Sequence, residues 1–309
     1  MTSVTVHAPA KINLSLGVGG LRDDGFHTLA TVYQALDLHD EVRATRRDDG
    51  HIGVSVVSEI DLAEDNHVPV GDDNLAVRAA RHLRDHLAAR GDNVASFGVD
   101  LAIRKVIPVA GGMAGGSADA AAALVACNAL WGAGLDRSTL ETLAADLGSD
   151  VPFAVRGGTA AGSGRGETLH PVLARGVFHW VVATSAAGLP TPEVFRTFDA
   201  LSDAHAADPV LPDALLEALA AGDAEALGAA LTNDLQAAAL SLRPGLQRTL
   251  DVGLAAGALG AVVSGSGPTC VFLAASPEHG LDIAVALASA ADTADVLQAT
   301  GPAAGAEVV

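Results

Sequence analysis

Alternating hydrophobic and polar positions dominate the first sixty residues of the chain. In residues 12–18 every second side chain is aliphatic, which predicts a strand with one face in the core. Lys11 and Asn13 belong to the opposite face and therefore project together. The same alternation predicts further strands at residues 4–7, 29–36, 41–44, 52–57 and 97–103.

A four-residue spacing of apolar side chains then indicates helices. From Leu75 to Leu87 such a residue recurs at every fourth position, and Gly91 ends the segment. Two more helices are predicted, an alanine-rich one at residues 118–131 and one that runs from a capping box of Ser138 and Glu141 to Gly148.

The second half of the chain begins with a change in composition. Glycine-rich residues 157–166 are interpreted as the crossing between two lobes, and the last nine residues as a loose tail. Thr191 and Pro192 have the pattern of a helix N-cap and first residue. Strands in hairpin-like clusters, with helices between them, predict an α+β fold. The remaining predicted elements are a strand at 177–183, helices up to 257, a strand–turn–strand at 260–275, and a final helix and strand.

Composition narrows the class of protein. Half of the 309 residues are hydrophobic, which is ample for a large core. A net charge of −19 disfavours general binding to nucleic acid or anionic membranes, so an anionic ligand needs a local site. No signal segment opens the chain, and its alanine-rich stretches are too short to span a bilayer, so we expect a soluble, cytoplasmic protein. Cys127 and Cys270 lie in apolar segments and are predicted to be buried thiols.

The segment PVAGGMAGGSADAAAAL, residues 108–124, carries the clearest chemical signal. Its glycines allow close backbone approach, and the helix that follows would direct free N–H groups and its positive dipole end at one place, which suits phosphate. A flexible turn explains the glycines equally well. The segment has neither the lysine of a Walker A loop nor the spacing of a dinucleotide-binding fingerprint, so both of these sites are excluded.

Several segments together resemble the GHMP kinases. The glycine-rich segment is similar to the phosphate loop of that family, and the chain also carries, in the family's order, PAKINL, DGFHTL, DDNLAVRAA, GSDVPF, PTPEVF, NDLQ and SGSGPTCVF. These segments run from Pro9 to Phe272 and are most similar to the subgroup that phosphorylates 4-diphosphocytidyl-2-C-methyl-D-erythritol (CDP-methylerythritol). The resemblance implies a two-lobed α+β kinase, with an N-terminal ATP-binding domain at 1–160, a C-terminal domain at 161–309 and the active site in the cleft between them.

The resemblance also implies the reaction and its partners. ATP would phosphorylate the 2-hydroxyl of CDP-methylerythritol, a step of the non-mevalonate route to isoprenoids, with Mg²⁺ bound mainly through the phosphates. Ser117 could contact the metal ion or a phosphate oxygen. We expect the protein to act as a monomer or weak homodimer, with these two small molecules as its partners and no nucleic acid or membrane.

The resemblance assigns roles at matching positions. Asp150 would receive the proton of the substrate hydroxyl, and Lys11 would orient that hydroxyl and offset charge. An ordinary carboxylate suffices for this work, because phosphoryl transfer depends more on positioning and charge stabilisation than on a strong base. Taken in isolation, Asp150 has the pattern of a turn or N-cap residue before Val151 and Pro152, but the context of the other segments favours catalysis.

The resemblance also implies which residues bind ATP and the substrate. The ATP side would be formed by Pro108, Ala110, Gly111, Gly112, Met113, Ala114, Gly115, Gly116 and Ser117, with Asn74 and Lys105 near the adenine. The substrate side would be formed by Asn13, Phe26, His27, Thr191 and Phe195, and Gly265–Gly267 would approach the active centre. Asn74 and Thr191 could also be helix caps, Phe195 a core residue, and Gly265–Gly267 a plain hairpin turn.

Two other functions remain open at this stage. Another GHMP kinase, of the homoserine or mevalonate type, would not need the aromatic residue and histidine of DGFHTL to hold a nucleotide. A non-catalytic nucleotide-binding sensor on the same fold would be expected to lose the base or the lysine. Both Lys11 and Asp150 are present.

Overall fold

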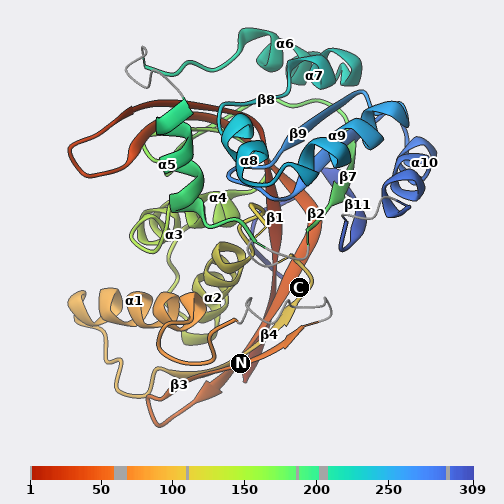
Figure 1. The fold of residues 1–309 in the computed structure, drawn as a ribbon. Helices are drawn as coiled ribbons and strands as arrows, with labels where there is room; N and C mark the ends of the chain where they lie inside the picture. Colours follow the sequence, from red (N-terminus) through yellow and green to blue (C-terminus); the bar gives the residue numbers. More distant parts are fainter. Residues whose placement is uncertain (1, 59–67, 109–110, 186–187, 202–207, 290–292) are drawn as a thin grey trace.

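Two β-sheets organise the chain, and helices cover them (Figure 1). The computed structural model describes residues 2–58, 68–108, 111–185, 188–201, 208–289 and 293–309. The first sheet has the strand order β12-β1-β2-β4-β3, with β5 and β8 joined to β2 and β1, and β6 to β5. Its strands are β1 (Ser3–Leu21), β2 (His27–Arg47), β3 (Ile52–Ser58), β4 (Gly98–Lys105), β5 (Thr159–Ser163), β6 (Thr168–Pro171), β8 (Thr232–Asn233) and β12 (Glu307–Val308).

The second sheet is smaller and antiparallel. Its strands, in the order β11-β7-β10-β9, are β7 (Phe178–Ala183), β9 (Gly260–Val263), β10 (Cys270–Ala274) and β11 (Val296–Gly301). Antiparallel hairpins separated by helices form an α+β architecture, as the strand clusters in the sequence predict.

The helices divide between the two sheets in the same way. Figure 1 places α1 to α4 beside the first sheet and α8 to α10 around the second. The first group is α1 (Leu75–Ala89), α2 (Gly115–Trp131), α3 (Arg137–Ala145) and α4 (Val151–Arg156). The second half of the chain adds α5 (Thr191–Leu201), α6 (Asp213–Ala221), α7 (Ala224–Ala230), α8 (Gln236–Leu242), α9 (Gly245–Ala255) and α10 (Pro277–Ala288).

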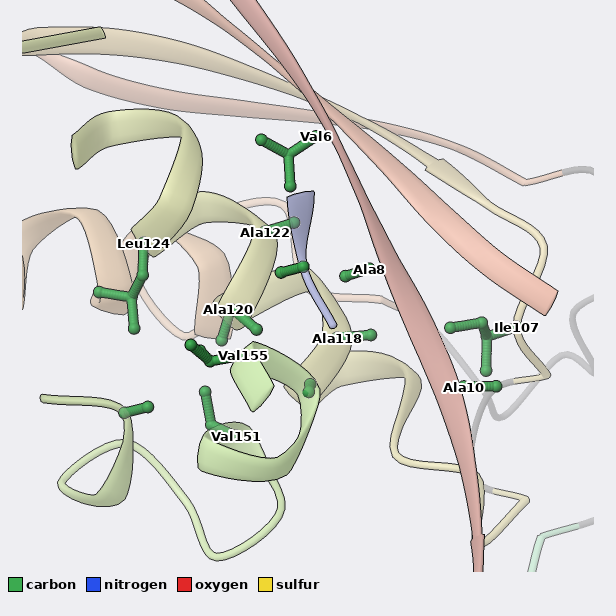
Figure 2. Close-up of a cluster of buried hydrophobic side chains, with 14 of the residues drawn as sticks. Val6, Ala8, Ala10, Ile107, Ala118, Ala120, Ala122, Leu124, Val151 and Val155 are labelled. Carbon is green, nitrogen blue, oxygen red and sulfur yellow. The ribbon is translucent and has the colours of Figure 1, made fainter. Parts of the chain in front are cut away.

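Helix α2 is apolar on all sides because it lies inside the protein. Its alanines let it approach the first sheet and α4 closely, as Figure 2 shows for Ala118 and Ala122 beside Ala8 of β1. Val151 and Val155 of α4 close the cluster from another side. This central position gives the N-terminus of α2, where the glycine-rich loop ends, a rigid support.

The first two strands are much longer than their sequence pattern predicts. β1 and β2 each merge two predicted strands, and their antiparallel pairing continues past irregularities at Pro9/Ala10 and Asn13/Ser15. Residues 8–16 are buried at every position, so both faces of β1 are covered there. The face that carries Lys11 and Asn13 therefore points into the protein, where sequence alternation alone suggests a surface.

Two predictions about residues 136–166 are wrong. The N-cap of α3 is Asp136, whose carboxylate accepts a hydrogen bond from the Thr139 N–H at 2.8 Å, so Ser138 does not start a capping box. Glu141 instead accepts hydrogen bonds from the Arg156 guanidinium. Residues 157–166 do not form a crossing, because β5 pairs with β2 inside the first sheet.

The C-terminal residues are not a loose tail either. β12 pairs with β1, with Val308 opposite Val6, and Ala306 is buried with its N–H bonded to the Ala154 carbonyl. The chain end thus returns to the first sheet, where backbone hydrogen bonds that the sequence pattern does not reveal hold it. The domain boundary at residue 160 stays a prediction.

The cysteine prediction is confirmed. Cys127 and Cys270 are free and buried, and burial raises the pKa of both thiols above the ordinary value. Within the described ranges, no helix combines the length and apolar character that crossing a bilayer requires.

Candidate active site

A cavity of about 610 Å³ collects most of the residues that the sequence assigns to a site. Its walls come from β1, β2, the N-termini of α2, α4 and α5, and the turns between β1 and β2, β5 and β6, and β9 and β10. The described lining therefore draws on segments from both halves of the chain, and only folding brings them together.

Lys11 and Asp150 face each other in this cavity. The Lys11 Nζ lies 3.8 Å from the nearer carboxylate oxygen of Asp150 and donates a hydrogen bond of 2.7 Å to Asn13 Oδ1. Only 6% of Lys11 is exposed, whereas a third of the Asp150 side chain remains open. A buried ammonium thus lies beside a carboxylate that a ligand in the cavity can reach, which places a positive charge and a potential proton acceptor at one point.

The structure shows what the Asp150 side chain contacts. It occupies the N-cap position of α4, yet its side chain makes no capping hydrogen bond. The carboxylate therefore does not serve the helix and remains directed at Lys11. The predicted juxtaposition of Lys11 and Asp150 is present in the structure.

Tyr33 also belongs to this centre, although sequence reasoning missed it. Burial, and then the negative charge and hydrogen bonding of Asp150, raise the pKa of Tyr33 well above its usual value. Its ring lies 5.5 Å below the Lys11 ammonium. One signal was available, because Tyr33 is the only tyrosine in the chain.

A hydrogen-bond chain fixes Asn13, and through it Lys11. Asn13 Nδ2 donates to Thr31 Oγ1 at 2.8 Å, and that hydroxyl donates to the Ser15 carbonyl at 2.6 Å. The contacts orient the amide so that its oxygen faces the ammonium. Lys11 is thus held by Asn13 while it lies beside Asp150.

The glycine-rich loop reaches the cavity as the start of α2. The helix begins at Gly115, three residues earlier than the sequence pattern predicts, after Ala114 in the left-handed region with φ of 59°. The N–H groups of its first turn have no acceptor within the helix, and Gly115, Gly116 and Ser117 line the cavity. These amides and the positive end of the helix dipole have the chemistry to hold an anion without a lysine.

The loop packs on the turn between β9 and β10, residues 264–267, which is the third glycine-rich segment of the chain. Gly112 has φ of 76°, and a Cβ at this position would lie 2.3 Å from the Ser264 carbonyl oxygen. The Ser264 hydroxyl donates to the Gly112 carbonyl at 3.3 Å, while the Lys11 N–H donates to the Met113 carbonyl. These contacts fix the loop relative to the reacting centre.

We expect Gly112→Ala to lower the free energy of unfolding by about 2–4 kcal/mol, because it combines left-handed strain with a backbone clash. Gly132→Ala is the matched control, since Gly132 also has positive φ (67°) but a Cβ there meets nothing within 4 Å. That variant should lose about 1 kcal/mol. Urea denaturation measures both values, and equal losses would contradict the clash.

The third glycine-rich segment reaches the active centre. Gly265 has φ of 59°, and a Cβ there would lie 3.3 Å from Asn13 Oδ1 and 3.5 Å from Lys11 Nζ. Asn233 holds this turn with hydrogen bonds of 2.7 Å from its Nδ2 to the Val263 and Gly265 carbonyls. The segment is a hairpin turn and also part of the cavity wall, so the two interpretations of it are compatible.

Aromatic side chains gather at the other end of the cavity. His27, which is 7% exposed, stacks on Phe195 at a centroid distance of 5.2 Å. Its Nδ1 lies 2.8 Å from the Gly19 carbonyl and its Nε2 lies 3.3 Å from Asp199. Phe26 is half exposed and lines the same end of the cavity, where an aromatic ring suits a planar ligand.

Thr191 lines the cavity between the aromatic end and the glycine turn. It opens α5, and its hydroxyl lies 2.9 Å from that of Ser266. Phe195, one turn later on α5, both lines the cavity and packs on the second core. The interpretation of Phe195 as a core residue is therefore compatible with its interpretation as a site residue.

The structure does not bring every candidate to the cavity. Lys105 is 1% exposed and donates to the carboxylates of Asp40 and Asp119, so its ammonium is buried between them and does not line the cavity. Asn74 caps α1: its Oδ1 accepts from the Ala76 N–H at 2.9 Å, and its Nδ2 donates to the Pro69 carbonyl.

Two loop candidates also do not line the cavity. Pro108 and Met113 are buried and outside the described lining, although the backbone of Met113 supports Lys11. Ala110 lies outside the described residues. Among the described residues, no group of three or more His, Cys, Asp or Glu side chains forms a metal-binding cluster.

Comparisons with known proteins define the class. Residues 74–158 match the model of the GHMP kinases N terminal domain, and residues 215–293 match that of the GHMP kinases C terminal domain. The chain belongs to the GHMP kinase family.

Two proteins that are similar to this chain over nearly its full length carry the same name. The chain is 54% identical to 4-diphosphocytidyl-2-C-methyl-D-erythritol kinase of Thermobifida fusca, over 100% of this chain and 99% of that protein. It is 53% identical to the protein of the same name from a Nocardioides species, over 98% and 99% of the two chains.

Solved structures agree with these relatives. A crystal structure of 4-(cytidine 5'-diphospho)-2C-methyl-D-erythritol kinase, at 34% identity, covers 96% of this chain and 98% of its own, with a TM-score of 0.75. Homoserine kinase from Cytophaga hutchinsonii has a TM-score of 0.76 at 19% identity and covers 100% and 98% of the two chains. The second likeness concerns the fold alone.

Proposed function

We propose that this protein transfers the γ-phosphoryl group of ATP to the 2-hydroxyl of CDP-methylerythritol, giving ADP and the 2-phosphate, in the non-mevalonate route to isoprenoid precursors. The observation that carries the proposal is the Lys11–Asp150 pair, 3.8 Å apart, in the same cavity as the free amides of α2. A proton acceptor and a phosphate cradle in one cavity are the parts that phosphoryl transfer requires.

The position of each group suggests its role in the reaction. The substrate hydroxyl would lie between Lys11 and Asp150; as its oxygen bonds to the γ-phosphorus, the proton passes to Asp150 and the bond to ADP breaks. Lys11 stabilises negative charge on the reacting oxygens, and the amides of Gly115 and Gly116 hold the phosphates of ATP. Mg²⁺ bound to those phosphates would neutralise developing charge, and the Ser117 hydroxyl at the same end of the cavity could contact it.

The aromatic end of the cavity supports a nucleotide-bearing substrate. Phe26, His27 and Phe195 offer ring faces and a ring edge for cytosine, while Asn13 and Thr191 offer polar groups along the way to Lys11. Plain alcohol substrates of the homoserine or mevalonate type have no ring to fill this space.

We place the protein in the cytoplasm, as a monomer or weak homodimer, with residues 1–160 as the ATP-binding lobe.

Turnover of ATP with CDP-methylerythritol tests the proposal directly. We expect the purified protein to form ADP and the 2-phosphate, detected by coupled ADP release and by ³¹P NMR of the product. Homoserine and mevalonate at the same concentration should give at most about one hundredth of that rate, because a site built to hold a polar ring discriminates strongly against ligands without it. ATP binding without transfer to any of the three alcohols would refute the proposal.

A further inference from the structure

The turn between β5 and β6 places an arginine in the cavity wall. Arg165 lies in the segment GSGRGE, residues 162–167, and lines the cavity together with Phe26, His27 and Lys11. Its guanidinium carbon lies 4.9 Å from the centroid of the Phe26 ring. The sequence pattern of this segment assigns it no chemical role, and the reaction outlined above does not use it.

The backbone of this turn is held in place. Gly164 and Gly166, on either side of Arg165, have φ of 73° and 103°. A Cβ at Gly166 would lie 2.2 Å from the Tyr33 hydroxyl, so the backbone packs directly on the active centre. The Leu29 N–H donates to the Gly164 carbonyl at 2.8 Å, and the Arg165 N–H donates to the Glu167 carboxylate at 2.6 Å.

The guanidinium itself keeps its hydrogen-bonding capacity. In the described part of the chain it donates no hydrogen bond, and its Nε lies 3.9 Å from a Glu167 oxygen, beyond hydrogen-bond distance. Its five N–H groups therefore remain available to a ligand in the cavity. Lys11, the other permanent cation in the described lining, already contacts Asn13 and Asp150.

The charges in and near the cavity indicate a role for the Arg165 guanidinium. CDP-methylerythritol carries two negative charges on the diphosphate that joins its nucleoside to the reacting alcohol. The chain has a net charge of −19, and Asp150 and Glu167 add negative charge near the cavity. A diphosphate buried there without a cation would be costly. A planar fork of N–H donors is the side-chain group best matched to phosphate oxygens.

We propose that Arg165 binds the diphosphate of the nucleotide-linked substrate and that its contact with Phe26 places it at the junction between the cytosine end and the reacting end of the cavity. This inference rests on the proposed function for the identity of the substrate. It makes Arg165 a specificity-determining residue, because it distinguishes a nucleoside diphosphate from the bare nucleoside.

Binding of CDP and of cytidine tests the inference separately from catalysis. Both affinities are measured by calorimetry with a saturating non-hydrolysable ATP analogue, so that CDP cannot occupy the ATP site. We expect Arg165→Met to weaken CDP binding by about 10- to 100-fold and to change cytidine binding by less than about 3-fold, since charge-assisted hydrogen bonds are lost only with CDP. Arg165→Lys should recover part of the loss, because it keeps the charge without the fork.

A matched variant controls for net charge. Arg248→Met removes the same charge from an exposed position on α9 and outside the cavity, and it should leave both affinities unchanged. In turnover assays Arg165→Met should raise the KM for CDP-methylerythritol and leave the KM for ATP within about 2-fold, as expected for lost substrate binding.

The outcomes separate the two proposals. Equal losses of CDP and cytidine affinity in Arg165→Met would overturn the inference, since Arg165 would then act only by holding Phe26. No loss with either ligand would overturn it as well. In both cases wild-type turnover of CDP-methylerythritol would leave the proposed function standing. A CDP-selective loss in a protein that does not phosphorylate CDP-methylerythritol would uphold the diphosphate contact and refute the proposed function.

Discussion

Replacing Asp150 by asparagine should lower kcat by about 10²- to 10⁴-fold and leave the KM values for ATP and CDP-methylerythritol within a few-fold. Asparagine keeps the shape of the side chain but cannot accept the proton of the reacting hydroxyl. Because the Asp150 side chain does not cap α4, the substitution removes chemistry without removing a helix contact. Steady-state kinetics with both substrates measures the effect.

Two further variants make this result interpretable. Asp146→Asn changes an exposed carboxylate four residues earlier, which pairs with His82 outside the cavity, and it should leave kcat unchanged. Asp150→Ala excludes recovery of activity through slow hydrolysis of the asparagine amide. Full turnover by Asp150→Ala would show that the base lies elsewhere.

Replacing Lys105 by methionine should lower the free energy of unfolding by about 3–5 kcal/mol, because it leaves buried carboxylates without their cation. Lys105 Nζ lies 2.9 Å from Asp119 and also contacts Asp40, and all three side chains are buried. Asp40 in addition accepts the N–H groups of Val106 and Ile107, where the chain leaves β4 toward the glycine-rich loop. Urea denaturation gives the loss.

The two carboxylates of this cluster are not equivalent. Asp119 Oδ1 is buried without a hydrogen-bond partner, whereas both oxygens of Asp40 are engaged. Burial, assisted by the charge of Asp40 and opposed by Lys105, raises the pKa of Asp119 to about 7. Asp119→Asn should therefore be better tolerated at pH 8 than Lys105→Met, and it should restore part of the stability when the two are combined.

The raised pKa of Asp119 also has a pH signature. The folded state keeps a proton that the unfolded state releases near the ordinary value of 3.8. The resulting stabilisation is present below that value and is lost as the pH rises through about 7. Denaturation at pH 5 and pH 8 should show this loss in the wild type and not in Asp119→Asn. The same pH dependence in both proteins would assign it to another group.

The sequence accounts for a large part of the site because its residues lie in short segments with their own local signals. Alternation along β1 places Lys11 and Asn13 on one face, and the glycines before α2 indicate a phosphate loop. The resemblance of ordered segments then joins these to Asp150. The sequence suggested that Lys105 lies near the adenine, but the structure shows it bonded to Asp40 of β2 and Asp119 of α2. Its position in the sequence before the loop carries no information about these two distant partners.

Arg165 and Tyr33 had no comparable signal. Both depend on the pairing of β5 with β2, which brings residues some 130 positions apart in sequence, such as Thr31 and Gly162, side by side. The glycine-rich composition of residues 157–166 suggests a linker, but these glycines allow a turn to pack on the Tyr33 hydroxyl. Local composition cannot distinguish the two, because the contact partner lies far away in the chain.

The sequence by itself determined the α+β class, the long helices, the buried cysteines and the kinase family, because periodicity and ordered motifs are local properties of the chain. Only the tertiary structure decided that Asp150 is free to face Lys11, that Asn74 and Lys105 stabilise the fold, that the last residues join the first sheet, and that Arg165 lines the cavity. The physical reason is that a side chain's role depends on which groups surround it, and long-range strand pairing brings those groups together.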